Sequence, residues 1–367
     1  MATTRAAVLN TAPGSLEMER LTIDAPTPDE VLVRVLHAGL CHSDLHEIDG
    51  TFESTPPIVL GHEGAGVVEA VGANVRGISV GDHVVSCLSA FCGHCRYCTN
   101  GQQTLCENRG ALSHDRPGAR LTNAAGVSVR PTAGIGAFAE HMLVHQNALV
   151  SIPKDMPLAQ ASILGCAITT GLGAVFRTAR IEPGSTVAVI GTGGVGMAAI
   201  QGARLAGAST IIAVDIVDDK LEKARGFGAT HTVNGRSVDS VAAVHEVTRG
   251  GVDYSFEAVG NARTVEQAFA MLGPGGTATV VGMVPEGTPI RINGPDLFLQ
   301  EKRLQGSFMG SNQFKTDIPH YVDLYLQGRL LLDEMVTDRL PFSLINEGFA
   351  LLGAGHATRV VVDMEES

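Results

Sequence analysis

The sequence predicts a two-domain α/β protein, with a β-rich domain and a domain built on a doubly wound parallel sheet. Three observations support this: a length of 367 residues, short apolar runs broken by glycine in the first half, and alternating strand and helix patterns after about residue 169. A chain this long exceeds what one ordinary hydrophobic core organises, so we expect two cores.

The composition is that of a globular protein with many tight turns, because 44% of residues are hydrophobic, 17% are charged and 44 are glycine. A net charge of -12 opposes binding to nucleic acid, whose phosphates attract clustered Lys and Arg. The first residues lack the apolar core of a secretion signal, so we expect a cytoplasmic protein. The uncharged stretches 156–176 and 183–203 are interrupted by polar residues and glycines, so no membrane partner is expected.

The strand-like runs of the first half and the alternating strand and helix patterns of the second region divide the chain into two domains. Between residues 31 and 85, strand-like segments include VLVRVLHAG and PIVLGHEGAGVVEAVG. The stretch 108–136 shows little periodicity, so we predict a long surface loop there. From about residue 313 the pattern is mixed, with a helix predicted over 317–327. The expected domains are therefore 1–168 together with 313–367, and 169–312.

A glycine-rich turn follows the first strand of the second region. The strand TVAVI leads directly into Gly191, Gly193, Gly194 and Gly196, and a helical pattern follows. Glycines at these positions permit a tight turn and close approach of a pyrophosphate to the helix N-terminus, as in a Rossmann domain. A glycine turn that binds nothing is the alternative interpretation.

An acidic residue supports the dinucleotide interpretation. Asp215 ends the next strand, 19 residues after Gly196, where a carboxylate can bond the adenosine ribose hydroxyls. The same charge would repel a 2'-phosphate, so NAD is favoured over NADP. Lys220 could also reach the ribose.

Four of the seven cysteines form a C-x2-C-x2-C-x7-C segment: Cys92, Cys95, Cys98 and Cys106. Four closely spaced thiolates satisfy tetrahedral zinc and leave no open position, which predicts a structural zinc site. Iron–sulfur ligation is the competing use of such a segment, and the dinucleotide motif argues against it. Packing is the expected role of the remaining Cys87.

A second possible ligand set is dispersed along the chain and consists of Cys41, His62 and Cys166. Two thiolates and a neutral imidazole would leave one zinc position open for a substrate, as a catalytic site requires. Each residue alone is more often structural, because a single cysteine usually packs in a core and a single histidine is usually hydrogen-bonded.

Together, the motifs resemble those of the zinc-dependent medium-chain alcohol dehydrogenases over essentially the whole chain. The resemblance is carried by GHEGAGVVEAVG at 61–72, CHSD at 41–44, the four-cysteine segment, Cys166 and GTGGVG at 191–196. It implies a GroES-like catalytic domain over 1–168 and 313–367 and a Rossmann NAD-binding domain over 169–312. It also implies two zinc ions per chain, with Cys41, His62 and Cys166 as the catalytic ligands.

The resemblance assigns catalytic roles to four further residues. Glu63 is expected beside the metal, and Asp44 is expected to orient His62. Ser43 and His46 match the positions of a proton relay, in which the serine hydroxyl takes the alcohol proton and the imidazole passes it to solvent. The alternatives are a solvated acid for Glu63 and a turn cap for Asp44.

Other matched positions imply contacts with the cofactor and the substrate. His42 and Arg359 are expected at the pyrophosphate, and Thr170 near the nicotinamide. Phe52 and Leu88 are expected to line an apolar substrate pocket, with ordinary core packing as the alternative, and the loop 109–136 is expected to help shape it.

The implied function is reversible oxidation of primary or secondary, alkyl or aromatic alcohols to aldehydes or ketones with NAD. An alternative within the family is oxidation of the formaldehyde adduct of a small thiol. A third hypothesis is a zinc-stabilised binding protein that has lost the chemistry, against which the complete set of matched residues argues. The family also implies a homodimer or homotetramer.

Overall fold

The computed structural model describes residues 2–114, 116–355 and 357–365. The chain divides into two compact units, of which unit 1 comprises Met1–Cys166 and Gln313–Ser367, and unit 2 comprises Ala167–Asn312. The division that we predicted lies two residues later, after residue 168. Positions 1, 356, 366 and 367 of the expected domain ranges, and position 115 of the expected loop, lie outside the described residues.

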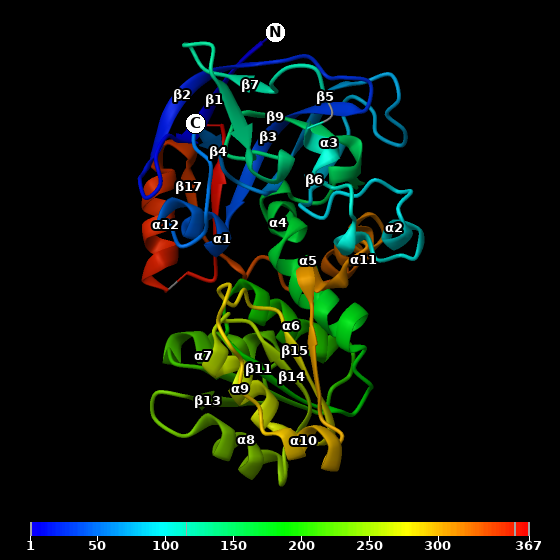
Figure 1. Cartoon of the computed structure of the whole chain (residues 1–367), viewed down its shortest axis with the longest axis vertical. Helices are drawn as coiled ribbons and strands as arrows, with labels where there is room; N and C mark the ends of the chain where they lie inside the picture. The colour runs from blue at the N-terminus through cyan, green and yellow to red at the C-terminus, as the bar shows by residue number, and fades with distance from the viewer. Residues whose placement is uncertain (1, 115, 356, 366–367) are drawn as a thin grey trace. The chain divides into compact units, whose positions relative to one another are not determined.

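Unit 1 contains a closed barrel and a seven-stranded sheet (Figure 1). The barrel strands are β1 (Ala2–Leu9), β2 (Leu16–Ile23), β7 (Leu121–Thr122), β8 (Ser128–Pro131) and β4 (Ile58–Val59). The sheet consists of β10 (Leu149–Ile152), β6 (His83–Ser86), β5 (Glu63–Val71), β3 (Glu30–Leu40), β18 (Arg359–Asp363) and β17 (Val336–Pro341), with β9 (His141–His145) also paired to β3. The helices of this unit are α1 (His42–Ile48), α2 (Arg96–Thr99), α3 (Ala111–His114), α4 (Leu158–Ser162), α11 (Phe314–Leu326) and α12 (Ile345–Ala354).

Strand β3 is the centre of the seven-stranded sheet. It pairs antiparallel with β5, β9 and β18, so it joins segments from the beginning, the middle and the end of unit 1. Its valines Val31, Val33 and Val35 alternate with more exposed residues and are at most 1% exposed. This two-residue period is the one that a half-buried strand requires.

The stretch 108–136 differs from the long surface loop that we predicted. It contains α3, the short strands β7 and β8, and a turn of 3-10 helix over Thr132–Gly134. Strands of two and four residues are too short to show an alternating pattern, and tertiary pairing with β2 and β4 forms them. The predicted helix over 317–327 is α11, which begins three residues earlier, at Phe314.

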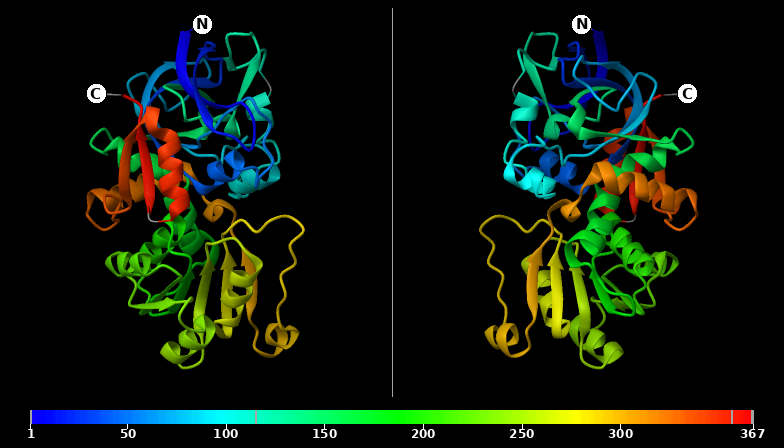
Figure 2. Two further views of the ribbon diagram at one scale, coloured as in Figure 1. Left: turned by 90° about the vertical axis from the view of Figure 1, so that its left-hand side faces the viewer. Right: turned by 90° about the vertical axis from the view of Figure 1, so that its right-hand side faces the viewer.

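Unit 2 contains the predicted parallel sheet, and the predicted α/β fold class is thereby confirmed. Its six parallel strands follow the order β13 (His231–Asn234), β12 (Thr210–Asp215), β11 (Thr186–Ile190), β14 (Val252–Glu257), β15 (Leu272–Val280) and β16 (Arg303–Gly306). This order reverses direction at β11, as in a doubly wound sheet. The helices of the unit are α5 (Ala167–Gly173), α6 (Gly194–Leu205), α7 (Asp218–Phe227), α8 (Ser240–Thr248), α9 (Ala262–Ala270) and α10 (Gly294–Leu299). Figure 2 shows helices of this unit on either side of its strands.

Among the described residues, no single helix is long and apolar enough to cross a membrane. Two consecutive helical segments, Leu158–Gly165 and Ala167–Ala179, reach that length and composition only when they are taken as a bent pair.

Candidate active site and metal centres

The dispersed set of predicted ligands meets at one place in unit 1. Cys41 follows the end of β3, Glu63 begins β5 with His62 directly before it, and Cys166 ends the first segment of unit 1. One potential ligand atom from each of these four residues lies within 4.8 Å of every other. His62, Glu63 and Cys166 are buried, at 3%, 0% and 7% exposure. Sulfur and imidazole donors at this spacing fit a zinc ion.

Asp44 holds the imidazole of His62 in place. Its Oδ1 atom accepts a hydrogen bond of 3.1 Å from the N–H of Gly61 and lies 3.2 Å from Nδ1 of His62. The carboxylate is 1% exposed, so water does not compete for this contact. A partner on Nδ1 fixes the tautomer that leaves Nε2 available as a ligand.

The three donor groups shift one another's pKa values. The thiol of Cys166 hydrogen-bonds to Cys41, which places the pKa of Cys41 well below its usual value and raises the pKa of Cys166 well above its usual value. Burial lowers the pKa of His62, but the carboxylate of Asp44 and the sulfur of Cys41 outweigh burial and raise it. Zinc binds thiolates and a neutral imidazole, so its binding would release these protons.

Glu63 forms a buried ion pair with Arg359, the first residue of β18. The two side chains are 0% and 4% exposed. Burial raises the pKa of Glu63 to about 7, against the opposing effect of Arg359. Arg359, which we predicted to contact the pyrophosphate, thus pairs with Glu63, which we predicted to lie beside the metal. The Nε atom of Arg359 has no hydrogen-bond partner among the described residues.

The residues of the expected proton relay lie on helix α1. The hydroxyl of Ser43 is 3.2 Å from Sγ of Cys41 and 3.5 Å from Nε2 of His62, so it borders the ligand cluster. His46 is 38% exposed and has its Nδ1 atom 3.6 Å from a carboxylate oxygen of Asp49. Ser43 therefore adjoins the ligand cluster, and His46 reaches solvent.

Aromatic rings surround His46. The ring of Phe52 packs edge-on against it with centroids 4.9 Å apart, and the ring of the exposed His42 lies 6.4 Å away. The other residue predicted in the substrate pocket, Leu88, is half-buried and packs against the core of unit 1. The structure thus brings Phe52 to the relay helix and leaves Leu88 at the edge of the core.

The four cysteines of the contiguous set also converge. One sulfur from each of Cys92, Cys95, Cys98 and Cys106 lies within 4.8 Å of every other. Backbone N–H groups point at these sulfurs, as in the 3.3 Å contact from Cys92 N to Cys106 Sγ. Burial raises the pKa of Cys92, but the N–H groups of His94 and Cys95 reverse that effect and hold it at about 6. Donors aimed at sulfur favour thiolates, the form that binds zinc.

In contrast, burial raises the pKa of Cys87 to about 11, in keeping with a packing role.

Arg109 is a residue of this region that we did not predict to have a role. Its guanidinium donates to the carbonyl of Ala90 at 3.0 Å and to the carbonyls of Gln103 and Thr104 at 3.3 and 2.7 Å. It therefore joins the chain just before Cys92 to the chain just before Cys106. No local pattern marks such a residue, because its partners are backbone groups.

The glycine turn of unit 2 has the shape that phosphate binding requires. Gly191 has φ of 89°, and a Cβ on Gly196 would lie 1.8 Å from the carbonyl oxygen of Gly191, so both positions need glycine. Gly193 is different, because nothing lies within 4 Å of a Cβ built on it. Gly193 is the N-cap of α6, so this open space lies at a helix N-terminus, where N–H groups and the helix dipole favour an anion.

Asp215 is held rigidly beside that turn. Its Oδ2 atom accepts from the N–H and the hydroxyl of Thr192 at 2.7 and 2.8 Å, and Oδ1 accepts from the N–H groups of Ile216 and Val217. Lys220 lies in α7, five residues further on. Thr170 is buried in α5, where its hydroxyl is 3.5 Å from the sulfur of Met309.

Comparisons with known proteins agree with this geometry. Residues 27–154 match the family model of the alcohol dehydrogenase GroES-like domain, and residues 194–325 match that of the zinc-binding dehydrogenases. The chain is 37% identical to alcohol dehydrogenase 2 of Zea mays, over 99% of this chain and 97% of that protein. It is also 37% identical to a protein of Schizosaccharomyces pombe named probable S-(hydroxymethyl)glutathione dehydrogenase 1, over 99% and 98% of the two chains. The crystal structure of benzyl alcohol dehydrogenase from Acinetobacter calcoaceticus superposes with a TM-score of 0.93 at 36% identity and covers both chains completely.

We predict that Arg109→Ala lowers the stability of unit 1. The variant leaves three carbonyl groups without their charged donor, which should cost about 2 kcal/mol. Thermal and urea melts under reducing conditions measure the loss. The matched control is Arg96→Ala in the same segment, because Arg96 is 73% exposed and its pair with Glu107 should contribute less than about 1 kcal/mol. Equal melting shifts for the two variants would contradict the role given to Arg109.

Proposed function

The chain belongs to the zinc-dependent medium-chain alcohol dehydrogenases, and from this membership we propose that it oxidises primary or secondary, alkyl or aromatic alcohols reversibly with NAD. The family is one of oxidoreductases that act on CH–OH groups. The observation that carries the proposal is the buried cluster of Cys41, His62 and Cys166, with the Ser43 hydroxyl beside it.

We propose that Cys41, His62 and Cys166 hold the catalytic zinc and that the four-cysteine segment holds a second, structural zinc. A zinc ion held there would supply a Lewis acid for the alcohol oxygen, and NAD would supply the hydride acceptor. The protein supplies the remaining functions. Asp44 orients the His62 ligand, and Glu63 places a carboxylate at the cluster.

Proton transfer is assigned to helix α1. The Ser43 hydroxyl, 3.2 Å from a proposed zinc ligand, is placed to take the proton of the alcohol. His46 is 38% exposed and returns the proton to solvent. Phe52, packed on His46, offers an apolar surface for the carbon skeleton of the substrate, and we assign Leu88 to the same pocket.

For the cofactor, we propose that Gly191, Gly193, Gly194 and Gly196 receive the pyrophosphate, helped by His42 and Arg359, and that Thr170 contacts the nicotinamide side. NAD is preferred because the Asp215 carboxylate would repel a 2'-phosphate, while its rigid position suits a ribose hydroxyl. Lys220 on α7 is assigned to the same ribose.

The alternative within the family is oxidation of the formaldehyde adduct of a small thiol. The similarity to the S. pombe protein named for that kind of substrate supports it. An assay with formaldehyde, with and without a thiol, separates the two functions, because only the adduct reaction requires the thiol.

We also propose a cytoplasmic homodimer or homotetramer. None of the seven cysteines is in a disulfide, as expected in a reducing compartment. Phe298 and Leu299 on α10 are each 72% exposed, close in sequence to the edge strand β16. Exposed large apolar side chains and a sheet edge each favour association with another copy of the chain.

The proposed function is tested with two cysteine variants. Purified protein should contain two zinc ions per chain and produce NADH absorbance with a panel of alcohols. Cys41→Ser should abolish turnover while the melting temperature stays near that of wild type, because the core of unit 1 holds the segments of the dispersed site. Cys106→Ala should lower the melting temperature, since structural zinc binds peptides with about 10 to 16 kcal/mol, comparable to the stability of a domain. A fully stable and active Cys106→Ala protein, or a wild type with one zinc or with iron, would refute the assignment.

The cofactor preference is tested at Asp215. We expect wild type to prefer NAD and Asp215→Asn to lower the NAD-to-NADP ratio of kcat/KM by about tenfold, or ~1.4 kcal/mol. The matched control is Glu222→Gln, which removes one negative charge from the 82% exposed side chain of a residue on the neighbouring helix and should leave the ratio unchanged. A wild type that prefers NADP would show that Asp215 has another role.

The proton relay is tested at His46. His46→Gln should slow alcohol oxidation by roughly tenfold or more at low to neutral pH and less at high pH, where solvent hydroxide replaces the missing base. The control is His320→Gln, which changes an exposed histidine on α11. A pH–rate profile of His46→Gln that coincides with that of wild type removes His46 from the mechanism.

A further inference from the structure

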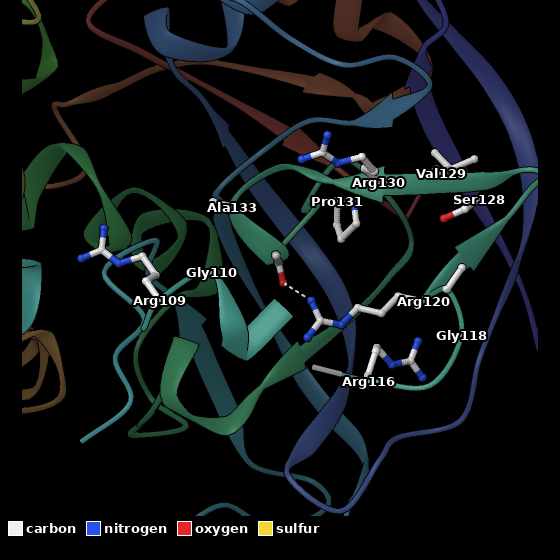
Figure 3. A pocket seen from close by; sticks show the side chains of 12 residues that line it. Arg109, Gly110, Arg116, Gly118, Arg120, Ser128, Val129, Arg130, Pro131 and Ala133 are labelled. Carbon is white, nitrogen blue, oxygen red and sulfur yellow. Dashed lines mark hydrogen bonds between the residues drawn. The ribbon is translucent and has the colours of Figure 1, made fainter. Parts of the chain in front are cut away.

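Two residues that the proposed function does not use lie shortly after the last cysteine of the four-cysteine segment. Asn108 is exposed, whereas Arg109 is half-buried and lines a pocket of about 450 Å³ together with other arginines. Figure 3 shows the guanidinium of Arg109 pointing away from those of Arg116 and Arg120. The hydrogen bonds of Arg109 lie instead with the chain that carries the cysteines.

Arg109 joins the two arms of the four-cysteine segment. Its Nε atom donates to the carbonyl of Ala90 at 3.0 Å, and its Nη2 atom donates to the carbonyls of Gln103 and Thr104 at 3.3 and 2.7 Å. The first carbonyl lies two residues before the first cysteine, and the others lie three and two residues before the last. Because the N–H donors of a guanidinium have a fixed planar arrangement, one side chain sets the spacing between the first and last ligands.

Arg109 also places a positive charge beside the sulfurs. Burial lowers the pKa of Arg109, against the opposing effects of the sulfurs of Cys106, Cys87 and Cys98. Four thiolates outweigh the charge of one zinc ion, so an occupied four-cysteine site is negative. A half-buried guanidinium stabilises that negative charge, because partial burial reduces the screening by water.

Asn108 supplies a side-chain donor to the first ligand. Its Nδ2 atom donates to Sγ of Cys92 at 3.7 Å, a length that suits the large sulfur atom. The same sulfur accepts from the backbone N–H of Cys95 at 3.4 Å. A donor aimed at sulfur favours the thiolate, which is the form that binds zinc. Unlike the backbone donor, the amide of Asn108 can be removed by substitution.

We propose that Asn108 and Arg109 retain the zinc ion of the four-cysteine segment. Asn108 does so through its hydrogen bond to Cys92, and Arg109 through its charge and through its bonds to both arms of the segment. This role rests on the structural zinc site proposed above. Both are positioning residues, because they act through the cysteines. Residues of this kind commonly change metal affinity by about 10- to 100-fold.

The rate of zinc transfer from the full-length, reduced protein to a coloured chelator tests the proposal. The release phase that remains in Cys41→Ser belongs to the four-cysteine segment, because that variant lacks a ligand of the other site. We expect Arg109→Gln to release this zinc roughly tenfold faster than wild type. Asn108→Ala should release it roughly threefold faster, since one hydrogen bond to a sulfur is lost.

Two further variants are the matched controls. Arg96→Gln removes the same charge from the same segment, but Arg96 is 73% exposed and pairs with Glu107. Arg120→Lys weakens another arginine of the pocket, whose terminal nitrogens donate to the carbonyls of Gly134 and Leu112, outside the segment. It therefore reproduces a loss of stability in unit 1, which thermal melts measure. Both controls should release zinc at the wild-type rate.

The proposal is overturned if Arg109→Gln or Asn108→Ala releases this zinc at the wild-type rate, or if either control accelerates release as much as Arg109→Gln. Asn108 is exposed, so its variant stays informative if Arg109→Gln fails to fold. A wild type without zinc in the four-cysteine segment would refute the structural site and the role of both residues. Unchanged release from a segment that does hold zinc refutes only the role of the two residues.

Discussion

The ion pair between Glu63 and Arg359 is the contact on which the candidate active site depends most. Both side chains are buried, and removing either partner from such a pair leaves an uncompensated charge in the interior. Glu63 begins β5 and Arg359 begins β18, and both strands pair with β3. The pair therefore fixes the ends of two strands at the place where Cys41 and His62 meet.

Asp44 extends the same constraint to helix α1. Its carboxylate accepts from Gly61 and contacts His62, so the helix that carries Ser43 and His46 is tied to the strand that carries the ligand. Buried polar groups of this kind require partners with defined geometry. The position of the relay residues thus follows from the requirement that Asp44, His62 and Glu63 be satisfied.

The sequence alone predicted features whose signals are local. The turn from Gly191 to Gly196 and the cysteines from Cys92 to Cys106 are contiguous, and their spacing determines what they can bind. The parallel sheet was predictable because its strands and helices alternate regularly. The dispersed cluster was different, since Cys41, His62 and Cys166 are ordinary residues individually and required a family resemblance to group them.

What the sequence did not predict depends on contacts between distant segments. Strands β7 and β8 exist because β2 and β4 pair with them, and the role of Arg109 depends on carbonyls that no spacing rule connects. The partner of Glu63 is 296 residues away along the chain. Such contacts arise from tertiary structure, which overrides local preference.

The interrupted course of unit 1 has a consequence for synthesis on the ribosome. Strand β18, from the end of the chain, lies between β3 and β17, while unit 2 is continuous from residue 167 to residue 312. Unit 2 can therefore fold as soon as it emerges, whereas residues 37–40 of β3 lack their partner strand until β18 is translated. During that interval Glu63 has no Arg359, and the incomplete sheet is the part of the nascent protein most exposed to chaperones and to aggregation.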